Sequence, residues 1–314
     1  MDISVIGTGV VDVLVGSVDE KIFSRGSTPM DFITLSFGGD ALNEAIILSR
    51  FGKQVQWISK VGDDDEGQRI LHYAQSNGID VSHVPVQSGL ATAVNIVLVD
   101  AAGERRFLTN PRSSLRNLTA EDILPHVDEM ASIVSFASLF VSTALDISAT
   151  EKIFARIKST GRTLTADTTR PKNGETLSDI ACLLKHVDYF FPNETELAAL
   201  TGSTDVDENI SALLDCGVKC AVVKRGGKGC VIAHGDERLK ISACPVEQVV
   251  DTTGAGDSFA AGFLFALSEG RSLVECAKFA SATASCSVEQ VGAVTGVTSL
   301  AKVFGRQTKL FSRF

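Results

Sequence analysis

The chain has 314 residues, of which 44% are apolar, so it can bury the core of one large domain. Its net charge of −9 at pH 7 argues against non-specific nucleic-acid binding, which needs a basic surface. The uncharged run at residues 130–145 is too short to span a bilayer, and the N-terminus lacks a targeting pattern. Seven cysteines without a Cys-x-x-Cys pair are typical of buried thiols in a reducing compartment. We therefore expect a cytoplasmic protein without nucleic-acid or membrane partners.

The N-terminal residues 3–9 are expected to form a strand and a Gly-x-Gly turn. A dinucleotide-binding fingerprint would need a third glycine and then a helix. Asp12 stands at that third position instead, and the β-branched residues of Val10–Val18 predict another strand. Asp12 is a candidate binding residue at a strand end, because a carboxylate can accept two hydroxyl hydrogen bonds. An exposed turn aspartate is the alternative interpretation.

A glycine pair, Gly38 and Gly39, precedes a predicted helix that ends at about Phe51. Its apolar residues recur with helical spacing and predict one buried face. Asp40 and Asn43 lie in its first turn, where Asn43 can point past the glycines.

Strands are expected at residues 54–59, 92–100 and 105–108, the last two joined by a turn at 101–103. The acidic run 63–66 could suggest a metal site, but it more often marks a solvated turn and a helix start. The hairpin, together with the irregular segment before Gly38, predicts a small separate sheet.

From about Thr119 the chain alternates between helix and strand patterns, which predicts crossover units and a parallel sheet. The expected fold is α/β, a doubly wound, mostly parallel sheet flanked by helices. The strands expected in this half are 140–142, 163–166, 189–191, 221–224 and 230–233.

Three polar segments follow these strands, at the sheet edge where ligands bind in open α/β sheets. They are residues 167–171, 192–196 and 224–229. Asn193 and Glu196 offer hard oxygen ligands that suit magnesium, although a glutamate in a first helical turn also serves the helix dipole. The segment 224–229 is glycine-rich but lacks the Lys-Ser/Thr ending of a Walker A loop, and a plain hairpin turn is its alternative.

Val249 and Val250 are expected to end a strand that leads into the small residues Gly254, Ala255 and Gly256. Their N–H groups can converge on an anion at the start of a helix, which Gly270 ends. Asp257 follows directly, so a general base would stand beside an anion site, as phosphoryl transfer requires. A simple helix cap is the alternative role for this aspartate.

Two segments together resemble the paired signatures of the PfkB/ribokinase family of carbohydrate kinases. The later one runs from Asp251 through Asp257 to Gly262, and the earlier one is the glycine pair followed by Asn43 and Ala45. The resemblance covers roughly residues 3–300. It implies a ribokinase-like fold in one domain, 1–314, with a lid from about 10–37 and 90–110. It also implies an ATP- and Mg²⁺-dependent sugar kinase that forms a homodimer through the lid sheet.

The resemblance implies a role for each residue that matches the family pattern. Asp257 would be the general base, and the amides of Gly254, Ala255 and Gly256 would hold the developing charge. Contacts to the acceptor sugar are expected from Asp12, Gly38, Gly39, Asp40, Asn43, Asn110 and Arg112. Contacts to the nucleotide are expected from Lys224, Gly226, Gly229 and Ser281. Asn193 and Glu196 would hold magnesium through waters, and Asp251 with Thr253 would help to hold the K⁺ found in several members.

Two residues depart from the family pattern. Asp40 stands where many ribokinase-like members carry another residue, so the acceptor need not be ribose. Thr169 replaces an asparagine, which leaves the role of residues 167–171 open. A nucleoside kinase of the same superfamily and a sugar-sensing protein without catalysis remain alternatives.

Overall fold

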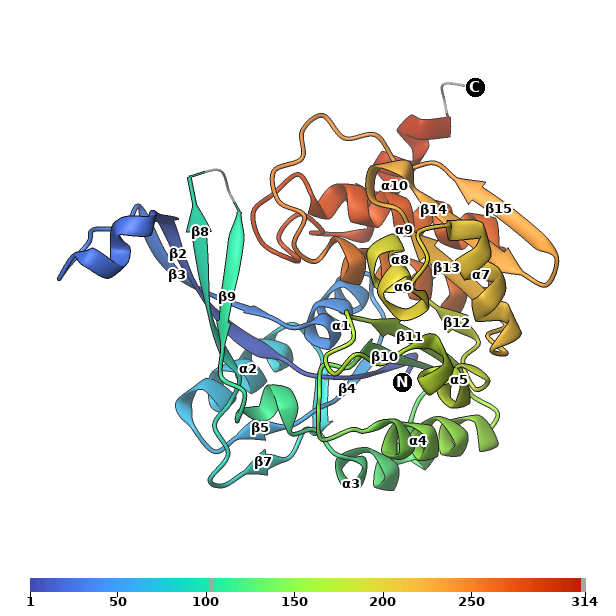
Figure 1. Ribbon diagram of the computed structural model, residues 1–314, viewed down its shortest axis with the longest axis horizontal. Coiled ribbons are helices and arrows are strands. Elements are labelled where there is room, and N and C mark those ends of the chain that lie inside the picture. The colour runs from blue at the N-terminus through green and yellow to red at the C-terminus, as the bar shows by residue number, and fades with distance from the viewer. Residues whose placement is uncertain (102–103, 312–314) are drawn as a thin grey trace.

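A nine-stranded sheet forms the centre of the computed structural model, which describes residues 1–101 and 104–311 (Figure 1). The spatial order is β15 (Glu237–Ile241), β14 (Cys230–His234), β13 (Cys220–Lys224), β12 (Tyr189–Phe190), β11 (Thr163–Thr168), β10 (Ile133–Leu139), β1 (Ile3–Ile6), β4 (Val55–Ile58) and β6 (Asp80–His83). Neighbouring strands from β6 to β13 run parallel, and β14 and β15 add an antiparallel edge. The expected doubly wound, mostly parallel α/β fold is confirmed.

Helices cover both faces of this sheet because alternate strand residues point to opposite sides. Val5 belongs to one buried apolar cluster and its neighbour Ile6 to the other. The first cluster includes residues of α1 (Asp40–Arg50), α2 (Asp65–Ser76), α8 (Ala255–Ser268), α9 (Leu273–Ser287) and α10 (Leu300–Phe311). The second includes residues of α3 (Ala120–Ile123), η3 (Leu124–Glu129), α4 (Ile147–Ser159), α5 (Leu177–Leu184), α6 (Glu194–Thr201) and α7 (Val206–Asp215).

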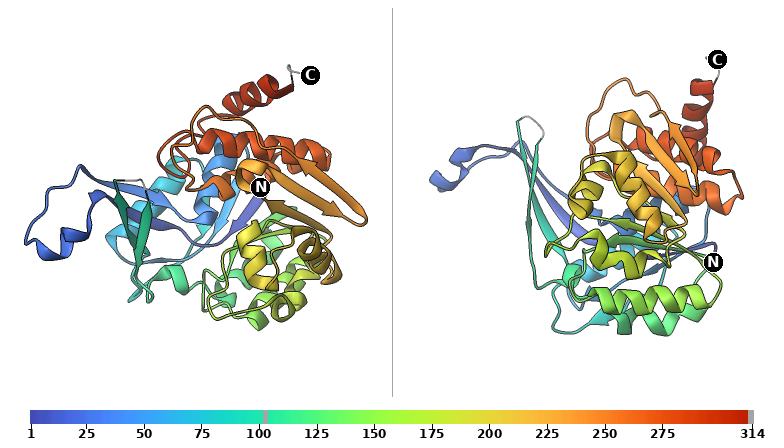
Figure 2. Two further views of the ribbon diagram at one scale, coloured as in Figure 1. Left: turned by 45° about the horizontal axis from the view of Figure 1, so that its top comes forward. Right: turned by 45° about the vertical axis from the view of Figure 1, so that its right-hand side comes forward.

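A smaller four-stranded sheet stands to one side of these layers (Figure 2). Its spatial order is β3 (Phe32–Gly38), β2 (Val10–Val18), β8 (Val94–Asp100) and β9 (Arg105–Thr109). The predicted turn at 101–103 lies largely outside the described residues. The remaining short elements are β5 (Val61–Gly62), β7 (Val86–Gln87), η1 (Glu20–Ser24), η2 (Ser114–Arg116) and η4 (Gly226–Lys228).

Three sequence predictions about strands were wrong. The strand expected at 140–142 is β10, which ends at Leu139, and the backbone leaves the strand conformation at Phe140 with a φ of 68°. Val249 and Val250 belong to no strand of the described chain and are 56% and 48% exposed. Asp12 lies within β2 rather than at a strand end. For β10, the long uncharged run 130–145 left the strand boundary undetermined.

The acidic run 63–66 forms a turn and a helix start. The Asp64 side chain accepts a hydrogen bond from the N–H of Gly67 at 2.9 Å and caps α2. The cysteines are free thiols, and burial raises the pKa of Cys220, Cys230 and Cys276 to about 12. Within the described residues, every helix is too short or too polar to cross a membrane.

Candidate active site

The turn before α8 depends on a glycine. Gly254 has a φ of +71°, and a Cβ atom there would lie 2.6 Å from the carbonyl oxygen of Ala293. A side chain at this position would therefore be both strained and blocked. The N–H of Ala255 donates to the carbonyl of Thr252 at 3.2 Å, so this amide already closes the turn. That the amides of Gly254, Ala255 and Gly256 converge on an anion stays a prediction.

Asp257 lies in the first turn of α8, where Asn43 from α1 reaches it. Asn43 Nδ2 donates to Asp257 Oδ2 at 2.7 Å. The start of α1 rests against the turn after β1, since a Cβ on Gly39 would lie 2.5 Å from the carbonyl oxygen of Thr8. The two signature segments thus meet at one carboxylate.

A cavity of about 460 Å³ lies on one side of Asp257, a size suited to a small-molecule ligand. It joins all six residues predicted to contact nucleotide or magnesium, which are Asn193, Glu196, Lys224, Gly226, Gly229 and Ser281. Ala255 and Gly256, predicted to hold the developing charge, line it as well. Val246, Val249 and Val288 give the same cavity an apolar wall, which suits a flat base.

A second cavity, of about 390 Å³, lies on the other side of Asp257, between the small sheet and the main body. It joins most of the residues predicted to contact the acceptor, and Asn95, Arg105 and Arg116 also line it. The predicted ones are Asp12, Gly38, Gly39, Asp40 and Asn43. Asn95 Nδ2 donates to Asp12 Oδ1 at 2.9 Å and fixes that carboxylate.

The two cavities share three lining residues, Asp40, Thr169 and Asp257. A ligand in either cavity can therefore approach the Asp257 carboxylate. This junction is the position that a group transferred between two ligands must cross.

Burial governs the electrostatics of this junction. Desolvation, with the nearby charges of Asp40 and Asp167, raises the pKa of Asp257 well above its ordinary value, against the lowering effect of its bond from Asn43. Desolvation also raises the pKa of Asp40. Glu44, one turn further along α1, is buried and its pKa is raised well above the ordinary value by desolvation.

Lys224 supplies a positive charge among these carboxylates. Its Nζ lies 2.5 Å from Asp167 Oδ2, and both side chains are largely buried. Burial opposes the charge on Lys224, but Asp167 and Glu196 together raise its pKa. A Cβ on Gly256 would lie 3.3 Å from this ammonium, so Lys224 also stands at the start of α8. Lys224 therefore lies beside the predicted anion site as well as at the start of the glycine-rich segment 224–229.

Asn193 and Glu196 form a capping box at the start of α6. Asn193 Oδ1 accepts from the Glu196 N–H at 2.9 Å, and Glu196 Oε2 accepts from the Asn193 N–H at 2.8 Å. The helix-start role considered from the sequence is therefore real. Both residues also line the larger cavity, where Asp40, Asp167 and Asp257 add oxygen atoms. This donor set fits a magnesium ion held through water.

Ser281 and Asp251 are both engaged within the protein. Ser281 Oγ accepts from the Cys244 N–H at 2.8 Å. Asp251 accepts from the N–H groups of Thr253 and Gly292, at 2.9 and 2.7 Å. Arg105 of β9 forms an ion pair with the same carboxylate. Through these bonds Asp251 stabilises its own turn.

Asn110 and Arg112 are exposed and, in the described parts of the chain, lie outside the lining of both cavities. The Asn110 side chain instead accepts from the Arg112 N–H at 3.0 Å. Sequence reasoning missed Arg105 and Asn95. Asn95 lies on β8 and Arg105 on β9, at alternate strand positions that share the face of Asp12. The alternation of residues in these strands was the available signal.

Comparisons with known proteins agree with this geometry. A family model described as pfkB family carbohydrate kinase matches residues 3–300. An uncharacterized sugar kinase of Archaeoglobus fulgidus is 30% identical, over 80% of this chain and 97% of its own. A nucleoside kinase of Methanothermobacter thermautotrophicus is 28% identical, over 98% and 96%. The structure of Arabidopsis thaliana ribokinase complexed with ribose and ATP superposes with a TM-score of 0.82 at 25% identity, over 97% and 98% of the two chains.

Proposed function

Because the chain belongs to the pfkB family of carbohydrate kinases, we propose that it transfers the γ-phosphate of ATP to a hydroxyl group of a small carbohydrate. One observation carries this proposal: Asp257 lines both cavities. ATP would occupy the larger cavity, and the acceptor would lie under the small sheet.

Asp257 would act as the general base. Its carboxylate would take the proton of the acceptor hydroxyl as that oxygen bonds to the γ-phosphorus and the bond to the β-phosphate oxygen breaks. The hydrogen bond from Asn43 holds Oδ2 in place, so the second oxygen is free to take the proton. A raised pKa makes this carboxylate a stronger base than an exposed aspartate.

Charge on the transferred phosphate would be met by the start of α8 and by Lys224. The helix dipole and the Gly256 backbone favour an anion there, and the Lys224 ammonium stands beside them. Magnesium, when bound, would offset the repulsion between the triphosphate and the cavity's carboxylates, and Glu196 and Asn193 would hold it through water.

The acceptor would be bound mainly by Asp12, whose second oxygen is not engaged by Asn95. A carbohydrate offers the paired hydroxyl groups that such a carboxylate accepts. A nucleoside is the second candidate, because a nucleoside kinase aligns with 98% of the chain. The ribose of a nucleoside offers the same hydroxyl pair.

The proposal includes a potassium ion held near Asp251 and Thr253. A cation beside Asp251 and Thr253 would have to share the Asp251 carboxylate with Arg105. It would act by fixing the turn before α8 rather than by touching phosphate.

We also propose that two chains pair through the small sheet. The strand register brings Leu35, Val13, Ile96 and Leu108 into one row on the face opposite the acceptor cavity. Leu35, Ile96 and Leu108 are 53%, 42% and 55% exposed. A contiguous exposed apolar row is typical of an interface, and a second copy of the chain would cover it.

The test is a coupled assay of ADP formation from MgATP, with sugars, sugar acids, sugar phosphates and nucleosides as acceptors. Turnover with a sugar supports the proposal, and turnover with nucleosides alone supports the second candidate. Binding of ATP and a sugar without turnover would identify a sensor and overturn both.

A further inference from the structure

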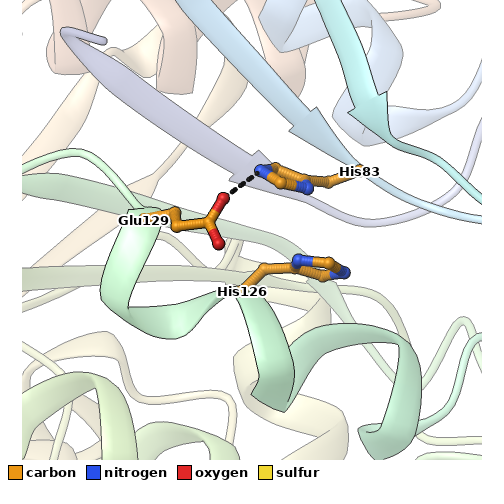
Figure 3. A group of neighbouring side chains, drawn as sticks. All are labelled: His83, His126 and Glu129. Atoms are coloured by element: carbon orange, nitrogen blue, oxygen red, sulfur yellow. Dashed lines mark ion pairs between the residues drawn. The ribbon is translucent and has the colours of Figure 1, made fainter.

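A cluster of three side chains away from the active site has the composition of a transition-metal site (Figure 3). It consists of His83, His126 and Glu129, which we call the histidine cluster. One potential ligand atom from each residue lies within 4.8 Å of the others. The two imidazole rings lie against each other with centroids 4.1 Å apart, and His83 Nε2 lies 3.2 Å from Glu129 Oε2.

The fold brings these residues together from two distant segments. His83 is the last residue of β6, the edge strand of the nine-stranded sheet. His126 and Glu129 belong to the 3₁₀ helix η3 and are three residues apart. A 3₁₀ helix has three residues per turn, so residues at this spacing project from the same face. That face is turned toward the end of β6, as Figure 3 shows.

We propose that the histidine cluster binds a Zn²⁺ ion. Imidazole nitrogen and carboxylate oxygen are ligands that zinc accepts, whereas magnesium prefers oxygen alone. Zinc bonds of about 2.1 Å in tetrahedral geometry place ligand atoms about 3.4 Å apart. The His83 Nε2 and Glu129 Oε2 atoms, 3.2 Å apart, are already close to that spacing. The remaining separations, all within 4.8 Å, would close by rotation of side chains. Water would complete the coordination.

Exposure of the Glu129 side chain allows this rearrangement. The His83 side chain is 13% exposed and is held by the sheet edge, whereas that of Glu129 is 64% exposed and can turn toward an ion. One ligand is therefore fixed and another adjustable. The ion would link the edge strand β6 to η3, which packs through Val127 into the second apolar cluster, together with residues of α3 to α7.

The site is separate from the proposed chemistry. In the described part of the chain, no residue of the histidine cluster lines either active-site cavity. The primary effect of zinc should therefore be a change in stability, because an ion that binds only the folded chain stabilises it by mass action. The inference does not depend on the kinase activity.

The experiment is isothermal titration calorimetry of the chelator-treated full chain with zinc sulfate, together with thermal melts. We expect one ion per chain at this site and a rise in melting temperature. His126→Ala and His83→Gln should each weaken binding by at least about 10–100-fold, since losing even an outer partner of a metal ligand costs that much. Both should also reduce the rise in melting temperature at a given zinc concentration.

His234→Ala is the matched control, because His234 is an exposed histidine on β14, near the opposite edge of the sheet. It should bind zinc as the parent does. Melts without zinc establish that each variant is folded. Equal zinc affinity in the parent and in the folded His83→Gln and His126→Ala variants would overturn the proposal and leave an ordinary ion pair between His83 and Glu129.

Discussion

The Asn43 side chain donates a hydrogen bond of 2.7 Å to the Asp257 carboxylate, across 214 residues of sequence. This bond joins the first turns of α1 and α8, the helices that begin at the two glycine-rich segments. It leaves one carboxylate oxygen available at the junction of the two cavities.

Asp257→Asn should lower kcat by about 10²–10⁴-fold, the usual contribution of a positioned general base. The asparagine oxygen can still accept from Asn43, so the local geometry should survive. Steady-state kinetics with MgATP and the best acceptor measure the effect, and ATP affinity should be preserved. A variant that turns over at the parent's rate would remove Asp257 from the role of base.

The same substitution should stabilise the protein at high pH. Because the pKa of Asp257 is raised in the folded state, ionising it destabilises the fold as pH rises above the unfolded-state pKa toward the folded one. An asparagine cannot ionise, so its stabilising effect should be absent in acid and grow with pH. Thermal melts of parent and variant across pH check this. A melting-temperature difference independent of pH would contradict it.

Turnover should fall as the pH is lowered. The fall should begin at a higher pH than for a base with the ordinary aspartate pKa of about 3.9. The base must be ionised, and the pKa of Asp257 is raised well above that value. Burial also raises the pKa of Asp167, to about 7, so this residue must be separated from Asp257. The acid limb of the kcat profile should persist in Asp167→Asn and be lost from the residual activity of Asp257→Asn. The reverse pattern would assign the limb to Asp167.

Regular periodicity made most of the parallel sheet predictable from sequence, and the glycine-rich segments located both helices of the site. The ion pairs of Lys224 with Asp167 and of Arg105 with Asp251 were not predictable. Each joins segments whose relative position depends on the folded sheet, and side-chain chemistry alone does not select the partner. The predicted acceptor contacts of Asn110 and Arg112 were not found for a related reason, since the strand before them ends facing solvent.

Asp12→Ala should raise the KM for the acceptor far more than the KM for ATP. Asp12 lies in β2 and lines only the acceptor cavity, with its carboxylate held by Asn95. Initial rates with each substrate varied separately provide the measurement. Asn95→Ala should show the same preference more weakly, because it removes only the orienting bond. A selective loss of ATP affinity would show that the two cavities have been assigned to the wrong substrates.

Leu35→Glu and Leu108→Glu should convert a dimer into a monomer. Both residues lie in the exposed row of the small sheet, where a carboxylate would have to be buried without a partner. Light scattering after size-exclusion chromatography measures the mass. Val86→Glu, at a 43% exposed valine on β7, is the control and should leave the mass unchanged. A parent chain that is monomeric at all concentrations would refute the pairing.

Potassium should activate turnover, and Arg105→Gln should lower the potassium concentration required. The guanidinium of Arg105 is ion-paired with Asp251, so it competes with any cation that binds this carboxylate. Removing its charge should favour the cation, while the bonds from the Thr253 and Gly292 N–H groups keep Asp251 in place. Rates are measured at saturating acceptor, since Arg105 also lines that cavity. Arg106→Gln, one residue along β9, is the control and should leave the potassium response unchanged. If neither the parent nor Arg105→Gln responds to potassium, Asp251 serves the turn and the ion pair alone.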